Sequence, residues 1–192
     1  RKGQEAHPYQ VVPGGYYRTI VSGAIAAFGW DMLLLAATDH AGFERVLDSF
    51  FRRSLHHYKA WAKTEIPAFI CHDDMVWSSG PFMDPAFYRS VIFPRYAELW
   101  KPLREAGIPV LYCSDANWNM FLDDLVAAGA SGFIFEPMVD LDPIVEKYGQ
   151  THVIVGSKVD CRTLTYGTHD QIKEEIDASL DAARNCPGFM FA

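Results

Sequence analysis

Four residues with chemically capable side chains stand together at Cys71-His72-Asp73-Asp74. They follow a short apolar run, residues 66–70, which predicts a buried strand, and they precede a loop. Because an unpaired acid or imidazole is costly to bury, such residues usually lie at the carboxyl end of a strand, where the chain emerges into a cleft. Asp also favours turns and caps, so a purely structural role for Asp73 and Asp74 is an alternative to a catalytic one.

Polar or thiol residues also follow three later runs that predict strands. The three runs and the residues after them are 109–112 with Cys113-Ser114-Asp115, 132–135 with Glu136, and 152–155 with Asp160-Cys161. If these strands are parallel, their carboxyl ends meet at one rim of the sheet. We therefore expect the acids and thiols of the four segments to open onto one face of the protein.

Carboxylates at such a rim are suited to general acid–base catalysis. This role is predicted for Asp73, Asp74, Glu136 and Asp160. Zinc accepts thiolate and carboxylate ligands, so Cys113 and Asp115 are the predicted metal ligands. Side chains two residues apart on a strand point to the same face, which lets this pair aim into one cavity. The alternatives are a buried apolar role for Cys113 and a structural hydrogen bond for Glu136.

Aromatic and imidazole side chains near the strand ends predict a pocket for a flat ligand such as an aryl ether or a tetrapyrrole. The residues predicted to contact this substrate are His72, Trp77, Tyr112 and Trp118. Any one of these rings can equally pack a loop against the core.

The composition predicts a soluble enzyme-sized domain. The chain has 192 residues, of which 49% are hydrophobic and 21% charged, which indicates one domain over residues 1–192. The net charge of −7 argues against nucleic acid as a partner, and no apolar run is long enough to cross a membrane. Four widely spaced cysteines without a CxxC pair indicate reduced thiols, and hence a cytoplasmic location. The first residue is Arg1 and the last residues read as a strand, so we expect a fragment.

Strand-like and helix-like segments alternate along the chain. The predicted strands are 17–24, 66–70, 109–112, 132–135, 152–155 and 188–192. The predicted helices are 29–37, 40–64, two pieces within 84–107 separated by Pro94 or Pro102, 118–127, 142–147 and 168–184. Residues 1–15 and the segment between 156 and 167 are predicted loops. His56 and His57 are expected on the outer helical layer.

This alternation predicts an α/β fold with a parallel sheet, either doubly wound or barrel-shaped. No glycine-rich nucleotide-binding motif follows the first strand, whereas polar residues at four strand ends are typical of a barrel rim. A closed (β/α)8 barrel has eight strands and this chain has six predicted ones, so we expect a partial TIM-type (β/α)8 barrel that lacks the first strands.

Three blocks resemble one known family. They are HDDMVWSSGPFMDPAFY, FPRYAELWKPLREAGIPVLYCSDAN and VIVGSKVDCRTLTYGT. With them, residues 66–192 resemble the uroporphyrinogen decarboxylase superfamily, in particular its cobamide-dependent methyltransferase branch. The resemblance implies a TIM-type barrel to which this chain contributes strands three to eight. In the family's zinc methyltransferases a His-x-Cys pair follows the strand that corresponds to residues 109–112, and here Cys113-Ser114-Asp115 takes its place.

The resemblance implies methyl transfer between a small methylated donor or thiol acceptor and a corrinoid, with zinc as cofactor and a corrinoid protein as partner. One alternative is a cofactor-independent decarboxylase of a tetrapyrrole or another carboxylated substrate, in which an acid at the rim protonates the product. The other is a non-catalytic binding module, in which the acids are dispersed. The thiolate and carboxylate of Cys113 and Asp115 favour methyl transfer, because decarboxylation has no need of the thiol.

Overall fold

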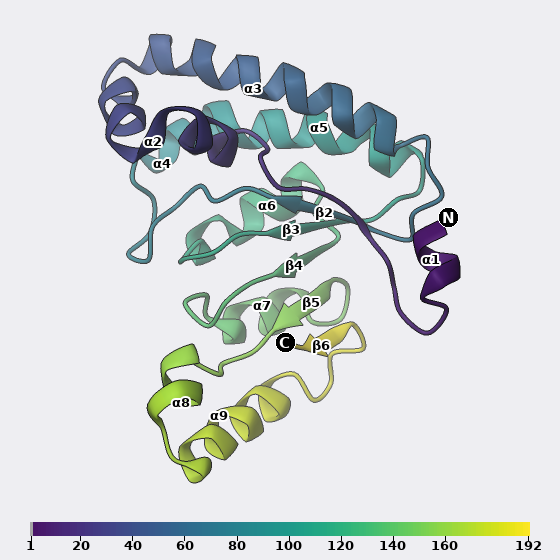
Figure 1. The fold of residues 1–192 in the computed structure, drawn as a ribbon. Coiled ribbons are helices and arrows are strands. Elements are labelled where there is room, and N and C mark those ends of the chain that lie inside the picture. The colour runs from purple at the N-terminus through teal and green to yellow at the C-terminus, as the bar shows by residue number, and fades with distance from the viewer. Residues whose placement is uncertain (1) are drawn as a thin grey trace.

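Six short strands form one parallel sheet in the order in which they occur along the chain (Figure 1). In the computed structural model, which describes residues 2–192, they are β1 (Gly14–Tyr16), β2 (Phe69–His72), β3 (Val110–Cys113), β4 (Gly132–Ile134), β5 (Val153–Gly156) and β6 (Phe189–Phe191). A doubly wound sheet reverses its strand order at a switch point, whereas a (β/α)8 barrel does not. The sheet is therefore part of a TIM-type barrel, as predicted.

Nine α-helices occur in the described residues. They are α1 (Lys2–Ala6), α2 (Val21–Ala37), α3 (His40–Trp61), α4 (Pro85–Phe87), α5 (Phe93–Glu105), α6 (Leu122–Ala128), α7 (Leu141–Tyr148), α8 (Cys161–Tyr166) and α9 (His169–Ala182). A π-helical turn (Tyr88–Ile92) joins α4 to α5, and a 3-10 turn (Asn119–Phe121) precedes α6. Helices α3, α5, α6, α7 and α9 follow one another around the outer side of the curved sheet (Figure 1). Within residues 2–192, no helix is both long and apolar enough for a membrane span.

The two faces of the sheet differ because side chains alternate along each strand. Cys71, Tyr112, Phe133 and Ile154 lie side by side in register on four neighbouring strands, and all four are fully buried beneath the helices. The residues that follow them in each strand belong to the opposite face. There His72 lies beside Cys113, and Cys113 beside Ile134. This register places a histidine and a thiol on the inner face of the partial barrel.

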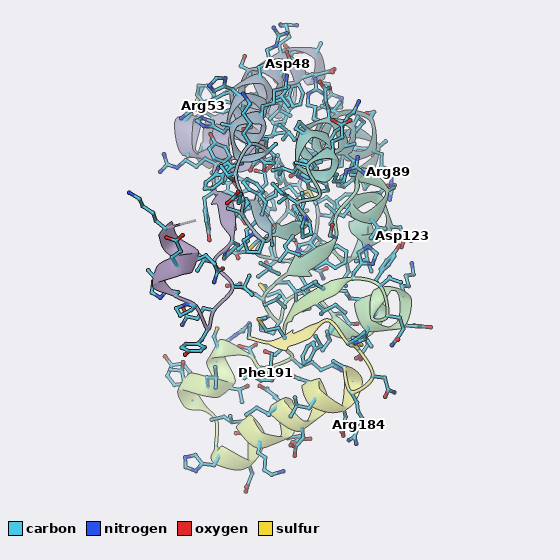
Figure 2. All side chains as sticks on the ribbon, turned by 90° about the vertical axis from the view of Figure 1, so that its right-hand side faces the viewer. Asp48, Arg53, Arg89, Asp123, Arg184 and Phe191 are labelled. Atoms are coloured by element: carbon cyan, nitrogen blue, oxygen red, sulfur yellow. The ribbon has the colours of Figure 1, made fainter. Side chains whose placement is uncertain are left out.

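The helical layer follows from the apolar periodicity of its sequences. Helix α3 buries Phe43, Leu47, Phe51 and Tyr58 against its neighbours, while His56 is exposed and His57 stacks on Tyr16 from outside the core. Charged residues point away from the sheet, as Figure 2 shows for Asp48, Arg53, Arg89, Asp123 and Arg184. Both histidines therefore lie in the outer helical layer, as predicted.

The strand predicted at residues 17–24 is wrong. The first strand is β1, and Val21 begins helix α2 despite the β-branched run Thr19-Ile20-Val21. A tertiary contact accounts for this difference: the backbone N–H groups of Ile20 and Val21 donate hydrogen bonds to the carboxylate of Asp73. Local strand propensity cannot anticipate such a contact.

Two predicted loops also contain helices. Helix α1 lies within residues 1–15, and α8 follows an Asp N-cap at residue 160. Pro102 lies inside α5 without ending it, while Pro94 lies in the first turn of α5, directly after the π-helical turn. Helix α9 begins with a capping box, since Thr168 and Gln171 exchange hydrogen bonds.

We predict that His152 makes the fold sensitive to acid. Its half-buried ring stacks on Phe133, with 5.9 Å between ring centroids, and burial lowers its pKa below the ordinary value of 6.5. Protonation therefore favours the unfolded chain. The stability that the neutral ring contributes is fully present above the pKa of His152 in the unfolded chain. It is lost as the pH falls through the lower pKa of His152 in the folded protein. In urea unfolding at pH 7.5 and 5.5, His152→Gln should lose less stability than the wild type on acidification. An equal loss in the two proteins would contradict this role.

Candidate metal-binding site

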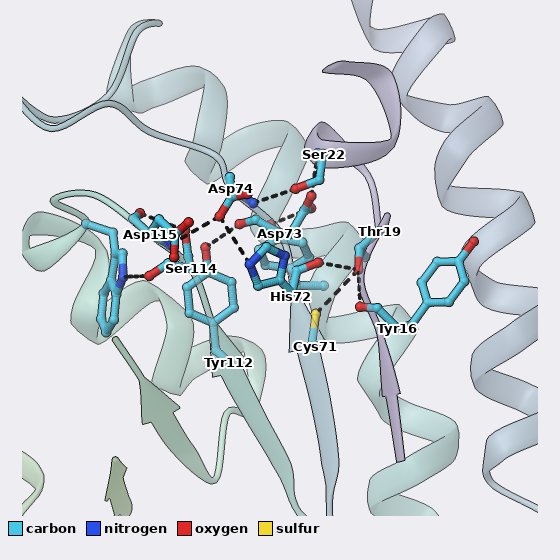
Figure 3. A network of polar contacts seen from close by, with 12 residues as sticks. Tyr16, Thr19, Ser22, Cys71, His72, Asp73, Asp74, Tyr112, Ser114 and Asp115 are labelled. Carbon is cyan, nitrogen blue, oxygen red and sulfur yellow. Dashed lines mark hydrogen bonds and ion pairs between the residues drawn. The ribbon is translucent and has the colours of Figure 1, made fainter. Parts of the chain in front are cut away.

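Asp73 is buried at the end of β2 and binds the start of helix α2 (Figure 3). Its carboxylate accepts hydrogen bonds from the backbone N–H groups of Ile20 (3.0 Å), Val21 (3.2 Å) and Ser22 (2.6 Å). The hydroxyl of Tyr96 donates a fourth bond of 2.7 Å. Burial raises the pKa of Asp73, and these four bonds lower it. The expectation that Asp73 opens onto the rim is wrong, because both oxygens are engaged in joining α2 to the sheet.

A second set of bonds fastens the same segment to the end of β2. The backbone N–H of Asp74 donates to the hydroxyl of Ser22 at 2.6 Å, and the hydroxyl of Thr19 donates to the carbonyl of His72 at 3.0 Å. The backbone of residues 72–74 is thus held on two sides. This support orients the side chains of His72 and Asp74.

His72, Asp74 and Asp115 form a compact cluster at the ends of β2 and β3 (Figure 3). One potential ligand atom from each residue lies within 4.8 Å of the other two. Nε2 of His72 is 3.5 Å from Oδ1 of Asp74, which accepts a 3.1 Å bond from the backbone N–H of Asp115. The imidazole of His72 stacks on Tyr17 at 5.0 Å. The cluster therefore combines one nitrogen and two carboxylates with a partly buried setting.

The electrostatics of this rim are acidic. The pKa of Asp115 is raised by burial and by the charge of Asp74, with a smaller opposing effect of His72. Burial and the charges of Asp115 and Asp74 raise the pKa of Glu136. Burial and the charges of Asp115, Asp74 and Glu136 raise the pKa of the Cys113 thiol to about 12. A divalent cation at the cluster would relieve this repulsion between carboxylates.

The donor set of the cluster fits zinc or a similar divalent ion. Imidazole nitrogen and carboxylate oxygen are both zinc ligands, and a catalytic zinc site needs three protein ligands with one position open. The predicted ligand Asp115 belongs to the cluster. Cys113 does not, and His72 and Asp74 complete the set instead. Cys113 lies beside His72 in the sheet register and is half-buried.

Two residues that were predicted to contact substrate are buried in the core. Tyr112 and Trp118 have no exposed surface. The hydroxyl of Tyr112 donates to the carbonyl of Asp73 at 2.9 Å, and the indole N–H of Trp118 donates to the carbonyl of Ser114 at 3.1 Å. Both predictions are wrong, because these rings hold the strand ends from beneath. Trp77 is 42% exposed, and His72 lies in the metal cluster.

Asp160 and Glu136 differ in their surroundings. Asp160 caps helix α8, since its carboxylate accepts a 2.7 Å bond from the backbone N–H of Arg162, and this bond lowers its pKa. These contacts give Asp160 a structural role at the start of α8, and its catalytic role stays a prediction. Glu136 is exposed, and among residues 2–192 its carboxylate forms no hydrogen bond or ion pair shorter than 4 Å. It stays available for chemistry.

The sequence predicts a substrate contact for His72, and the structure places its side chain in the cluster with Asp74 and Asp115. The signal in the sequence for this cluster is the spacing of His72 and Asp74, which puts both side chains on one face of the extended chain. Ser22 and Tyr96 were missed entirely, because each is more than 20 residues from Asp73 in sequence and no local pattern connects them.

Comparison with known proteins agrees with the barrel topology. A methyltransferase from Methanosarcina mazei has a similar structure, with a TM-score of 0.68 and 18% sequence identity. The likeness covers 99% of this chain and 55% of the other, so the chain spans about half the length of that protein. A search of curated proteins found no match. The sequence model of one family, described as uroporphyrinogen decarboxylase (URO-D), matches residues 29–192, and this chain therefore belongs to that family.

Proposed function

We propose that the protein takes part in methyl transfer and that it holds a divalent metal ion, zinc in particular, at His72, Asp74 and Asp115. The observation that carries the proposal is the convergence of three ligand atoms within 4.8 Å at the ends of two neighbouring strands. In TIM-type barrels this end of the strands is where active sites lie. The structural likeness to a methyltransferase supports the choice of reaction.

When bound, the metal would act as a Lewis acid on a methylated oxygen or hold a thiol acceptor as its thiolate. The protein's own groups have separate tasks. Asp73 and Ser22 position the ligands, and Glu136 exchanges the proton, since its raised pKa brings it nearer to neutral pH. Trp77 packs against Trp30 and Phe82, and its exposed side remains a substrate contact. The proposed partners are a small methylated molecule or thiol and a protein that carries a corrinoid.

The charges at the site favour methyl transfer over decarboxylation of a polycarboxylate. Besides burial, the pKa values of Cys113, Asp115 and Glu136 are raised by the charges of neighbouring carboxylates. The one opposing group is His72, which acts on Asp115. A substrate with several carboxylates would be repelled there. Arg162, which a carboxylate could have used, lies 3.4 Å from Asp160. The convergence of Asp74 and Asp115 also argues against a non-catalytic module with dispersed acids.

The test is an assay of methyl transfer from methylcobalamin to a small thiol, followed by the change in the corrinoid absorption spectrum. We expect the zinc-loaded protein to accelerate this transfer and Asp115→Asn to reduce the rate at least about tenfold, because one of the three metal ligands is weakened. Cys113→Ser is the matched control and should keep the rate. No acceleration by zinc-loaded protein, together with CO2 release from a carboxylated tetrapyrrole, would establish the decarboxylase alternative.

A further inference from the structure

A cavity of about 300 Å3 lies beyond the carboxyl ends of β4, β5 and β6. Its apolar wall includes Val159, Leu164 of α8, Ile176 of α9 and Phe191 of β6. Figure 2 shows Phe191 on the side of the sheet that faces α8 and α9. This volume is at the lower end of the range for small-molecule sites, about 300–1,000 Å3. The cavity therefore suits a small apolar body.

Several polar groups in the wall are engaged with one another. Asp160 lies 3.4 Å from Arg162 and caps α8, and the hydroxyl of Ser157 donates to the carbonyl of Ala192 at 2.6 Å. Glu136 also lines the cavity, and its carboxylate has no such partner among residues 2–192. Glu136 thus offers the cavity a carboxylate with both oxygens available as hydrogen-bond acceptors, beside an apolar wall.

Glu136 connects the cavity to the metal cluster. Cys113 of β3 pairs with Ile134 of β4, and Asp115 and Glu136 each stand two residues beyond that pair. The two acids therefore occupy equivalent positions at the ends of adjacent strands. A molecule in the cavity with its polar end at Glu136 would present that end towards the cluster.

We propose that this cavity binds the apolar body of a small molecule that carries one hydroxyl or ammonium donor, with the donor at Glu136. The inference deepens the proposed function, on which it rests for the identification of this molecule as the substrate. Asp160 and Arg162 in the wall pair with each other, so the charge of Glu136 is left over and repels anions. A carboxylate in place of the donor is therefore rejected.

The experiment measures binding to the metal-free protein, so its outcome does not depend on methyl transfer. Phenol and benzylamine serve as probes with a neutral and a cationic donor, and benzoate as an anion of similar size. The readout is protection of Cys161, an exposed thiol in the cavity wall, from alkylation by iodoacetamide, resolved by peptide mass spectrometry. We expect saturable protection by phenol, benzylamine or both, and at least about tenfold weaker protection by benzoate. Whichever of phenol and benzylamine binds more tightly shows whether the ligand carries a hydroxyl or an ammonium donor.

Substitutions inside and outside the cavity wall test whether the probes bind in this cavity. Leu164→Arg, at a position 56% exposed, should abolish protection, whereas Leu35→Arg, at a position 63% exposed on helix α2, should not. Glu136→Gln should remove most of the discrimination against benzoate, because it removes the nearest negative charge. Circular dichroism verifies that each variant is folded. The proposal is overturned if neither donor protects Cys161, if benzoate protects as well as they do, or if both arginine variants have the same effect.

Discussion

Replacing Asp73 by Asn is expected to lower the free energy of unfolding by about 3 kcal/mol. All four groups that contact this buried carboxylate are donors, three backbone N–H groups and the hydroxyl of Tyr96. An Asn side chain has the same shape, but its NH2 group would face donors and leave buried N–H groups unpaired. The loss should be measured by urea unfolding at neutral pH, followed by tryptophan fluorescence.

The control is Asp160→Asn. Asp160 also accepts a backbone N–H bond at a helix N-terminus, but it lies near the surface, and Asn is as good an N-cap residue as Asp. Its replacement should change the free energy of unfolding by less than about 0.5 kcal/mol. If Asp73→Asn were as mild as this control, the carboxylate would not be what holds helix α2 to the end of β2.

Asp115→Asn and His72→Ala are each expected to weaken zinc binding about 100-fold, measured by calorimetric titration of the metal-free protein. Each removes or weakens one of the three ligands in the cluster. Cys113→Ser should bind zinc as the wild type does, because Cys113 lies outside the cluster. The opposite ranking, with Cys113→Ser weak and His72→Ala unaffected, would restore the Cys113–Asp115 pair that the sequence favours.

Much of the site could be predicted from sequence because it follows from strand alternation. Apolar runs placed β3, β4 and β5 to within one residue, whereas β2 overlaps its predicted run only at residues 69–70. The polar residues after these runs marked the rim. The same alternation separates His72 and Asp74 from Asp73, since successive side chains of an extended chain point to opposite faces. Grouping Asp73 with Asp74 as rim acids overlooked this, and the structure shows the consequence: one carboxylate is buried and the other lies in the cluster.

What could not be predicted depends on contacts between distant segments. The β-branched run at Thr19 has strand propensity, but the carboxylate of Asp73, more than 50 residues away, accepts hydrogen bonds from the backbone where helix α2 begins. The register of β2 on β3 is likewise absent from either strand alone. It places His72 beside Cys113 and brings Asp115 near the imidazole, and on this geometry we propose His72, Asp74 and Asp115 as the metal ligands.

The most direct test of the account is anomalous X-ray diffraction at the zinc edge from crystals of the protein grown with zinc. The cluster predicts one strong anomalous peak within about 2.0–2.2 Å of Nε2 of His72 and of a carboxylate oxygen from each of Asp74 and Asp115. A peak bonded to the sulfur of Cys113 without His72, or strong peaks only at other places on the surface, would contradict it.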